Sequence, residues 1–372
     1  MRDFWPGGCP SAWKPGTYAS LPRVEAFVCH DCQGVGVISL RLAAARVVCR
    51  RLPPLAARRI GARLYSLDRG RKDNVRFVTR AKTGSYFTGM TADFNSHPMA
   101  LYGHNEWRNW TVALALSTAG DTIIEVGANV GTETVGFSDL VGPSGRVIAF
   151  EPHPDNLGAL NETLPLAMYK NVTLMPFAVG AEVTTTRFAA PPTTARSQGI
   201  GHILGPEESQ RGTITDHAAE VDWPVIEVEC VTLDSLADHL GPVRLLFVDA
   251  EGAEVSILQG GDKYLRMHRP DIVVEAVPDH LVRLGSSVEE LYETLRDLGY
   301  LCFAFRRLHL EELIDPTSSI DPLNWLCVPE SRLLVISSFE RLFRRCALLP
   351  CVMGLNPLVG ARLPPHSYGR AT

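Results

Sequence analysis

Residues 121–132 read Asp-Thr-Ile-Ile-Glu-Val-Gly-Ala-Asn-Val-Gly-Thr, in which a β-branched, apolar run stops at a glycine. The run predicts a buried strand that ends at Gly127, and the spacing to Gly131 predicts a tight turn followed by a helix. Glycines let a ligand approach the backbone closely, and the first N–H groups of a helix attract polar or anionic groups. The stretch therefore predicts a strand–turn–helix unit that binds a ligand at its turn.

The acid in this stretch narrows the choice of ligand. A dinucleotide-binding turn carries Gly-x-Gly-x-x-Gly around a pyrophosphate, whereas this chain has Gly127-x-Asn129-x-Gly131 with Glu125 two residues upstream. A carboxylate there would repel a pyrophosphate and would suit the α-ammonium group of an amino acid. We therefore predict S-adenosyl-L-methionine rather than NAD as the cofactor, with Thr132 at the start of the helix as a further binding residue.

A second acid follows at an informative distance. The apolar run from Val147 ends in Glu151, 20 residues after Gly131. In α/β nucleotide-binding folds, a carboxylate at the tip of the second strand holds the ribose hydroxyls. Because an ionised carboxylate accepts hydrogen bonds from two hydroxyls at once, Glu151 is the predicted ribose ligand.

Strand-like and helix-like runs alternate from Val75 onward, which is typical of a parallel sheet covered by helices. Most strand candidates are nearly continuous apolar runs, as expected of strands that are buried on both faces. We predict an α/β, Rossmann-like fold, with a mostly parallel seven-stranded sheet and helices on both faces. The predicted strands are 122–126, 147–151, 172–178, 245–249, 272–275, 301–305 and 325–328, and the predicted helices are 132–140, 155–164, 253–265 and 288–298.

A third block, residues 245–254, reads Leu-Leu-Phe-Val-Asp-Ala-Glu-Gly-Ala-Glu and carries three carboxylates around a glycine turn. Ligands of open parallel sheets bind at the carboxyl ends of the strands. Asp249 and Glu251 are therefore expected at the same edge as Glu125 and Glu151. Asp249 is the predicted catalytic base for a hydroxyl substrate, or alternatively an oxygen ligand of a divalent cation.

Three further side chains are weaker candidates. Glu254 begins the next helix, where an acid also stabilises the helix dipole, so a structural role is equally expected. Glu275 ends the next predicted strand at the same edge of the sheet. His202 lies in the long segment 180–230, whose length is typical of a lid or a binding loop, and it is the second candidate base.

Together these blocks resemble the FkbM family of methyltransferases over about residues 103–328. The resemblance rests on Glu-Val-Gly-Ala-Asn-Val-Gly at 125–131, Ala-Phe-Glu-Pro at 149–152 and Val-Asp-Ala-Glu-Gly-Ala-Glu at 248–254. It implies a class I methyltransferase fold and methyl transfer from S-adenosylmethionine, commonly to a hydroxyl of a sugar, lipid or polyketide-type small molecule. By position, it implies that Asp249 and Glu251 border the methyl-transfer site and that the cofactor is bound by Glu125, Gly127, Asn129, Gly131 and Glu151.

The chain departs from the family pattern at two positions. The family usually has Asp where this chain has Glu125, and the longer acid is compatible with the same contact. It usually has Lys where this chain has Phe247, so a cation beside the acids is missing. This departure leaves open a non-catalytic binding protein on the same fold, and an NAD- or nucleotide-binding oxidoreductase is the other alternative.

Charge and composition bear on partners and location. The net charge of −5 gives no overall attraction to nucleic acid, and none is predicted as a partner. Residues 41–82 carry thirteen Lys or Arg against two acids, which suggests weak contact with an anionic membrane surface, although a solvated basic helix pair is the simpler interpretation. No apolar run reaches the roughly 18 residues of a membrane span. The odd cysteine count in a long chain without a secretory signal indicates reduced thiols in a cytoplasmic protein.

The chain divides into three predicted parts. Residues 1–74 form a basic, partly helical or disordered extension, residues 75–330 form the methyltransferase domain, and residues 331–372 form a tail. Cys29 and Cys32 have metal-like spacing, but no regular second pair accompanies them, so no metal site is predicted. No pattern in the chain predicts an oligomeric state.

Overall fold

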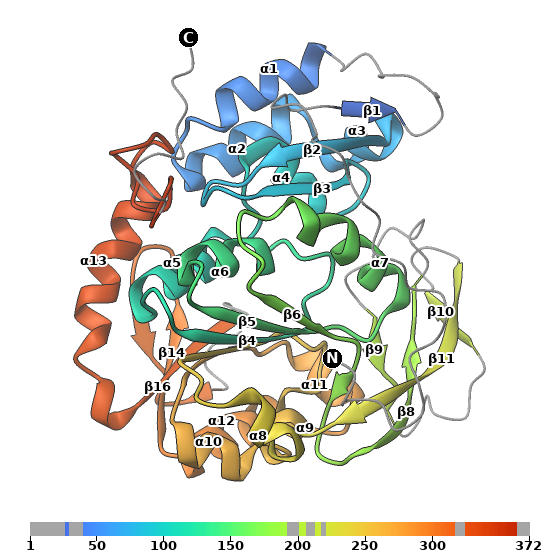
Figure 1. Cartoon of the computed structure of the whole chain (residues 1–372), viewed down its shortest axis with the longest axis vertical. Coiled ribbons are helices and arrows are strands. Elements are labelled where there is room, and N and C mark those ends of the chain that lie inside the picture. Colours follow the sequence, from blue (N-terminus) through green and yellow to red (C-terminus); the bar gives the residue numbers. More distant parts are fainter. Residues whose placement is uncertain are drawn as a thin grey trace.

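The computed structural model describes residues 27–29, 40–191, 201–205, 213–216, 221–316 and 324–362. Its centre is a sheet of eight strands in the order β15-β14-β16-β13-β12-β4-β5-β6 (Figure 1). The strands are β4 (Thr122–Val126), β5 (Arg146–Phe150), β6 (Val172–Met175), β12 (Leu245–Val248), β13 (Asp271–Glu275), β14 (Tyr300–Phe305), β15 (Leu310–Glu312) and β16 (Asn324–Pro329).

The predicted α/β fold with a mostly parallel sheet is confirmed, but the sheet has eight strands rather than seven. Five neighbouring strands run parallel to one another, namely β6, β5, β4, β12 and β13. Strand β16 runs antiparallel to both of its neighbours, β13 and β14. The additional strand, β15, has the sequence Leu-Glu-Glu and forms an antiparallel pair with β14. Its sequence lacks an apolar run, and therefore only the return of the chain beside β14 makes it a strand.

The order of the strands creates a crevice beside β4. The chain places β5 and β6 on one side of β4 and then crosses to the other side for β12 and β13. Where the strand order reverses in this way, the loops after neighbouring strands leave in opposite directions and open a crevice at the carboxyl ends. The turns after β4 and β12 both lie at this point.

Alternate residues of the central strands face two separate cores. Ile123 and Leu245 belong to one apolar cluster, and Ile124 and Leu246 belong to another. Because side chains of a strand alternate between its faces, both faces of the sheet are buried, and this explains the nearly continuous apolar runs. The first cluster includes residues of α5 (Trp107–Leu116), α6 (Thr134–Val141) and α13 (Val335–Leu348), and the second includes residues of α9 (Glu254–Gln259), α10 (Asp262–His268), α11 (Pro278–Arg283) and α12 (Val288–Asp297).

The predicted helices are confirmed with one correction. The helix predicted over 253–265 is two helices, α9 and α10, which are separated at Gly260 and Gly261. A Cβ atom on Gly260 would lie 2.0 Å from the carbonyl oxygen of Gly180, so the loop after β7 (Ala178–Val179) packs directly against this break. The remaining helices of this region are α7 (Pro154–Thr163) and the short α8 (Ala237–Leu240).

The described parts of the segment 178–231 form a smaller sheet beside the main one. The length of this segment predicts a lid or a binding loop, whereas its described residues form strands, in which β11 pairs with both β7 and β8. In Figure 1 this sheet stands beside the carboxyl ends of β4, β5 and β6. Its strands are β7, β8 (Thr184–Ala189), β9 (His202–Ile203), β10 (Thr213–Asp216) and β11 (Val221–Val231).

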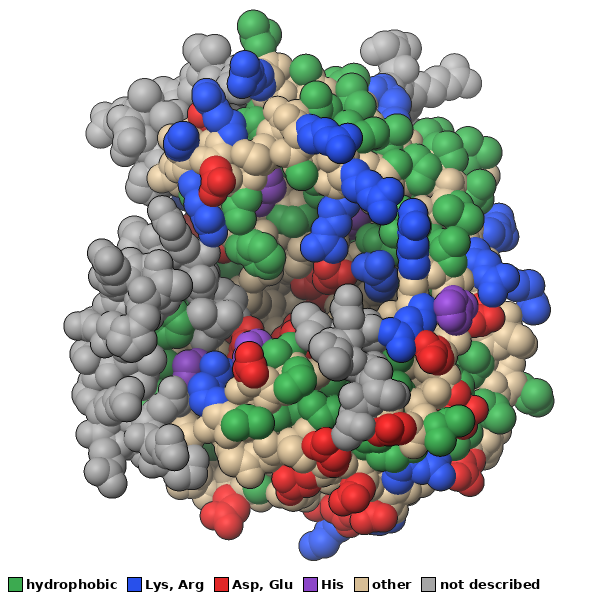
Figure 2. All heavy atoms as spheres, turned by 180° about the vertical axis from the view of Figure 1, so that it is seen from behind, with side chains coloured by type: hydrophobic (Ala, Val, Ile, Leu, Met, Phe, Trp, Pro, Cys, Tyr) green, Lys and Arg blue, Asp and Glu red, His purple; other side chains and the backbone are tan. Residues whose placement is uncertain are grey.

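The N-terminal part forms a layer above the main sheet (Figure 1). Its first two helices are separated just before Pro54, and the buried Leu42 and Phe77 join the same apolar cluster as Phe343 of α13. Lys and Arg side chains gather over this upper part of the molecule in Figure 2, and acidic side chains gather over the lower part. The elements of the layer are α1 (Leu40–Cys49), α2 (Pro54–Leu64), α3 (Leu67–Asp73), α4 (Ser96–Tyr102), β1 (Phe27–Cys29), β2 (Val75–Arg80) and β3 (Tyr86–Met90).

Within the described ranges, every helix is too short or too polar to cross a membrane.

Candidate active site

The turn after β4 has the backbone conformation that its glycines allow. Gly127 has a φ of 89°, and a Cβ atom there would lie 1.9 Å from the carbonyl oxygen of Asp249. Gly131 has a φ of 87°, and a Cβ atom there would lie 2.6 Å from the side chain of Leu160. Larger residues at either position would both strain the backbone and push neighbouring atoms apart. The turns after β4 and β12 are thus pressed together at the crevice.

Glu151, which follows β5, is held in place by the backbone. Its two carboxylate oxygens accept hydrogen bonds from the N–H of Asn129 at 2.7 Å and the N–H of His153 at 2.8 Å. Burial raises the pKa of Glu151 to about 7, although these hydrogen bonds favour the charged form. The carboxylate is therefore oriented before any ligand binds, and a hydrogen bond with the side chain of Asn156 adds to this.

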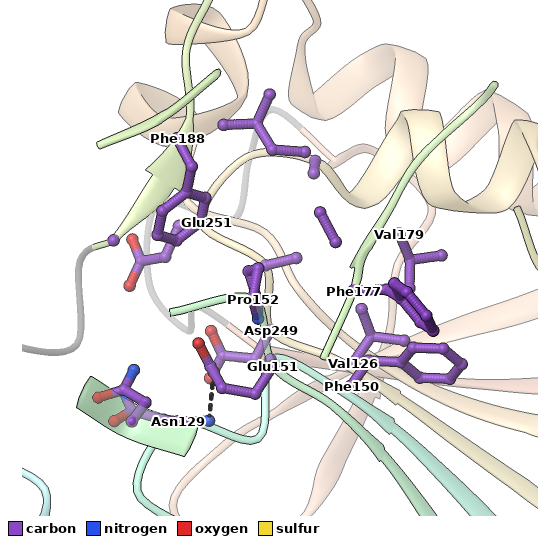
Figure 3. Close-up of a pocket in the computed structure, with 17 residues that line it drawn as sticks. Val126, Asn129, Phe150, Glu151, Pro152, Phe177, Val179, Phe188, Asp249 and Glu251 are labelled. Atoms are coloured by element: carbon purple, nitrogen blue, oxygen red, sulfur yellow. Dashed lines mark hydrogen bonds between the residues drawn. The ribbon is translucent and has the colours of Figure 1, made fainter. Parts of the chain in front are cut away.

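A pocket with about 530 Å³ of empty space lies over the ends of β4, β5 and β12. Figure 3 shows Glu151, Asn129, Asp249 and Glu251 around it, with the Asn129 hydrogen bond drawn as a dashed line. We call it the first pocket. Its walls are mainly apolar, with a few polar groups, as is usual for sites that bind small molecules. Among its lining residues are Gly127, Phe150, Asn156, Phe177, Ala178, Val179, Phe188, Gly201 and Ile203.

A second pocket, with about 370 Å³ of empty space, adjoins the first. The two pockets share Val126, Gly127 and Asp249, so the Asp249 side chain stands at their boundary. Phe137 and Phe247 stack in the wall of the second pocket, with ring centroids 4.4 Å apart. Its other lining residues are Asn109, Glu125, Glu133, Val248, Val273, Glu275 and Asn324.

Carboxyl groups crowd around the second pocket, and burial changes their acidity. The pKa of Asp249 is raised well above its ordinary value, by burial first and then by the charges of Glu275 and Glu251. Burial likewise raises the pKa of Glu125 well above its ordinary value, although Glu125 accepts a 2.7 Å hydrogen bond from Thr134. Burial also raises the pKa of Glu133 to about 7. A cationic group bound here would therefore stabilise the ionised carboxylates.

A histidine joins two of these acids. The Nδ1 atom of His280 lies 3.0 Å from a carboxylate oxygen of Glu251 and 3.4 Å from one of Glu275. Hydrogen bonding to Glu251 and Glu275 raises the pKa of His280 to about 9, so the ring is charged at neutral pH. The side chains of Glu251, Glu275 and His280 are also close enough to one another to hold a metal ion. A metal would have to displace the His280 proton, since metal ligation requires a neutral imidazole.

The free energy of unfolding should depend on pH in a way that reports the charge of His280. The folded-state pKa of about 9 lies above the ordinary value of 6.5, so the stabilisation is complete below pH 6.5 and is lost as the pH rises through 9. We expect His280→Gln to lower the free energy of unfolding by about 2 kcal/mol at pH 6 and by much less at pH 10. Denaturant unfolding of both proteins across this range measures the difference. His309→Gln, at an exposed position, is the control. A difference that stays constant with pH would contradict a charged His280.

Other predicted site residues lie around the pockets without lining them. Thr132 is buried, and its hydroxyl donates to the carboxylate of Glu133. Glu254 is buried and accepts a 2.9 Å hydrogen bond from the N–H of Ala250, so it braces the turn after β12. His202 is buried beside Trp223, with ring centroids 6.3 Å apart. Its neighbours Gly201 and Ile203 line the first pocket, and alternation along the extended chain turns His202 to the opposite face.

Two residues of the site lack a clear signal in the sequence. Glu133 follows the glycine turn directly, and its position two residues after Gly131 would have been the available hint. His280 offers no local hint, because only the turn between β13 and α11 brings it to Glu251 and Glu275. The structure does bring together Glu125, Asn129, Glu151, Asp249 and Glu251 around the two joined pockets.

The fold and the pockets define an α/β protein with a ligand site at the switch point of its sheet. Residues 125–302 match the family model of the methyltransferase FkbM domain. This stretch of the chain is therefore similar to the FkbM methyltransferase domain.

Solved structures of methyltransferases are similar to this chain. A methyltransferase FkbM of Methylobacillus flagellatus KT is 13% identical, over 77% of this chain and 58% of that chain, with a TM-score of 0.34. A precorrin-6y C5,15-methyltransferase of Geobacter metallireducens is 17% identical, over 60% and 87% of the two chains, with a TM-score of 0.32. An S-adenosylmethionine-dependent O-methyltransferase of Thermotoga maritima is 12% identical, over 68% and 77%, with a TM-score of 0.34. A search of curated proteins found no match.

Proposed function

We propose that this protein transfers a methyl group from S-adenosylmethionine to a hydroxyl group of a sugar, lipid or polyketide-type small molecule. The observation that carries the proposal is the placement of Glu151. Two backbone N–H groups hold its carboxylate at the tip of β5, at the edge of a pocket that begins at the glycine turn. This arrangement suits a ribose, whose paired hydroxyls donate to a single carboxylate.

The residues present fit the remainder of the cofactor as well. Phe177 and Val179 supply apolar walls for a base in the first pocket, close to Glu151. Gly127 lets the turn after β4 pack against the Asp249 backbone, and the acidic Glu125 suits the ammonium group of the amino-acid end. The amino-acid end would thus reach the second pocket at Glu125, and the acceptor would approach Asp249, which lines both pockets.

Asp249 is the proposed general base. When bound, the cofactor supplies a methyl group on a positively charged sulfur. The Asp249 carboxylate would accept the proton of the acceptor hydroxyl as that oxygen takes up the methyl group. A carboxyl group whose pKa is raised by its surroundings takes up this proton more readily near neutral pH. The apolar wall formed by Phe137 and Phe247 would help to exclude water from the reaction.

Phe247 stands where the family usually has Lys, yet the acids do not lack a cation. His280 comes from α11 and places a positive charge between Glu251 and Glu275. This observation favours an active enzyme over a non-catalytic protein on the same fold. Six cysteines whose side chains the structure describes are free thiols, as we expect of a cytoplasmic enzyme.

Calorimetric titration of the purified chain with S-adenosylmethionine, and separately with NAD, tests the proposal. We expect micromolar binding of S-adenosylmethionine and none of NAD. Labelled methyl groups should then be incorporated into a small-molecule extract, in linkages that resist the hydrolysis of methyl esters. A folded protein that binds NAD instead would support an oxidoreductase, and one that binds neither would overturn the proposed function.

A further inference from the structure

We propose that α1, α2 and the segment 351–355 form a docking surface for an anionic lipid bilayer. This proposal does not depend on the proposed function. It rests on an apolar stripe that faces outward, on arginines that flank it, and on the separation of charge over the molecule. We call this surface the basic–apolar face.

Helix α1 exposes an apolar side where a surface helix of a globular protein is normally polar. Leu42, Ala45 and Cys49 point into the core. On the opposite side, the side chains of Leu40 and Val47 are 88% and 59% exposed. Val48 and Ala44 are exposed as well, so the outward residues fall at helical spacing i, i+4, i+7 and i+8.

The C-terminal turns extend this apolar surface. The N–H of Cys351 donates to the carbonyl oxygen of Arg51 at 3.0 Å, which fixes the segment beside the end of α1. Met353 is 49% exposed and Leu355 is 52% exposed. Since α1 and α2 also pack against each other, the exposed Leu64 at the end of α2 belongs to the same layer. Contiguous exposed apolar side chains of this kind mark a binding surface.

Arginines surround these apolar residues without compensating acids. From Leu40 to Ser66 the chain has seven arginines and no acid. Arg46 and Arg50 turn inward and donate to the hydroxyl of Thr79. The other five are exposed, and within the described ranges no acidic side chain pairs with Arg58, Arg59 or Arg63. Each basic residue near an anionic leaflet contributes about 1 kcal/mol to binding.

The separation of charge orients the molecule. The whole chain carries −5, yet Figure 2 shows the basic side chains over the upper part and the acidic ones over the lower part. An anionic surface would therefore attract the part of the molecule that carries the basic–apolar face more than the acidic lower part. Nucleic acid would be drawn by the arginines, but its phosphates offer nothing to the apolar stripe. A bilayer satisfies both features, because apolar side chains enter the acyl boundary while arginines meet the headgroups.

Vesicle flotation of the full chain tests this proposal. We expect binding to vesicles in which a third of the phosphatidylcholine is replaced by phosphatidylglycerol, and little binding to phosphatidylcholine alone. The double variants Val47→Asp/Val48→Asp and Arg58→Glu/Arg59→Glu should each bind at least 10-fold more weakly. The control Met267→Asp/Val183→Asp changes two exposed apolar residues elsewhere and should bind like the wild type.

Thermal unfolding establishes that each variant is folded before its binding is compared. The proposal is overturned if the wild type does not bind anionic vesicles, or if both double variants bind these vesicles as strongly as the wild type. Light scattering that shows a dimer of the wild type, dissociated in Val47→Asp/Val48→Asp, would assign the face to a second copy instead. Retention on heparin without vesicle binding would assign it to a soluble polyanion.

Discussion

Glu151→Ala should weaken the binding of S-adenosylmethionine by at least 100-fold. The proposed ribose contacts are hydrogen bonds to a charged group, each worth about 1.5–3 kcal/mol, and tenfold in affinity corresponds to about 1.4 kcal/mol. The substitution also leaves the N–H groups of Asn129 and His153 without their acceptor, so the turn after β4 loses a brace. Calorimetric titration of the wild type and the variant measures the effect.

Two companion variants test this assignment: one separates the charge of Glu151 from its shape, and the other is a control at a distant acid. Glu151→Gln keeps the size of the side chain but not its charge, and it should bind with intermediate affinity. Glu162→Ala removes an exposed acid of α7 that pairs with Arg76, and it should bind like the wild type. Since the pKa of Glu151 is about 7 without ligand, wild-type affinity should fall below pH 7, and Glu151→Gln should lose this part of the pH dependence. Affinity of Glu151→Ala within threefold of the wild type would remove the residue from the cofactor site.

Asp249→Asn should lower kcat by about 100- to 10,000-fold while leaving the affinity for S-adenosylmethionine nearly unchanged. That range is typical for the loss of a general acid or base. Asparagine has the same shape as aspartate but cannot accept the hydroxyl proton. It also removes one of several mutually repelling carboxylates, so the variant should fold at least as stably as the wild type. Rates of S-adenosylhomocysteine formation with an acceptor found by labelled methyl transfer provide the measurement.

Two control variants test whether Asp249 is the general base. Asp238→Asn changes an exposed acid of α8 and should keep the wild-type rate. His202→Gln should also keep it, because the ring packs beside Trp223 and does not line either pocket. The fall in rate at low pH should disappear in Asp249→Asn. If His202→Gln lost the rate instead and Asp249→Asn kept it, the base would have to come from the smaller sheet.

Much of the main sheet could be predicted because its strands carry their own signals. A strand buried on both faces needs an apolar run, and the turn after β4 needs residues that tolerate a positive φ, such as Gly127 and Gly131. Both the apolar run and the glycine turn consist of residues that are close together in the sequence. The short β15 lacks such a signal, since it depends on pairing with β14. The break between α9 and α10 does carry a local signal, the pair Gly260-Gly261, against which the backbone of Gly180 packs.

The sequence by itself therefore determined the α/β fold, the ligand-binding turn and the acids at the carboxyl ends of the strands. Only the tertiary structure decided that His280 stands between Glu251 and Glu275, and that Phe247 and Glu133 line a second pocket. The tertiary structure also decided that Val47 faces outward beside the arginines and that His202 faces away from the first pocket. The physical reason is the range of the interactions. Hydrophobic periodicity and glycine turns act between residues a few positions apart, whereas these arrangements come from the packing of segments that are distant in the chain.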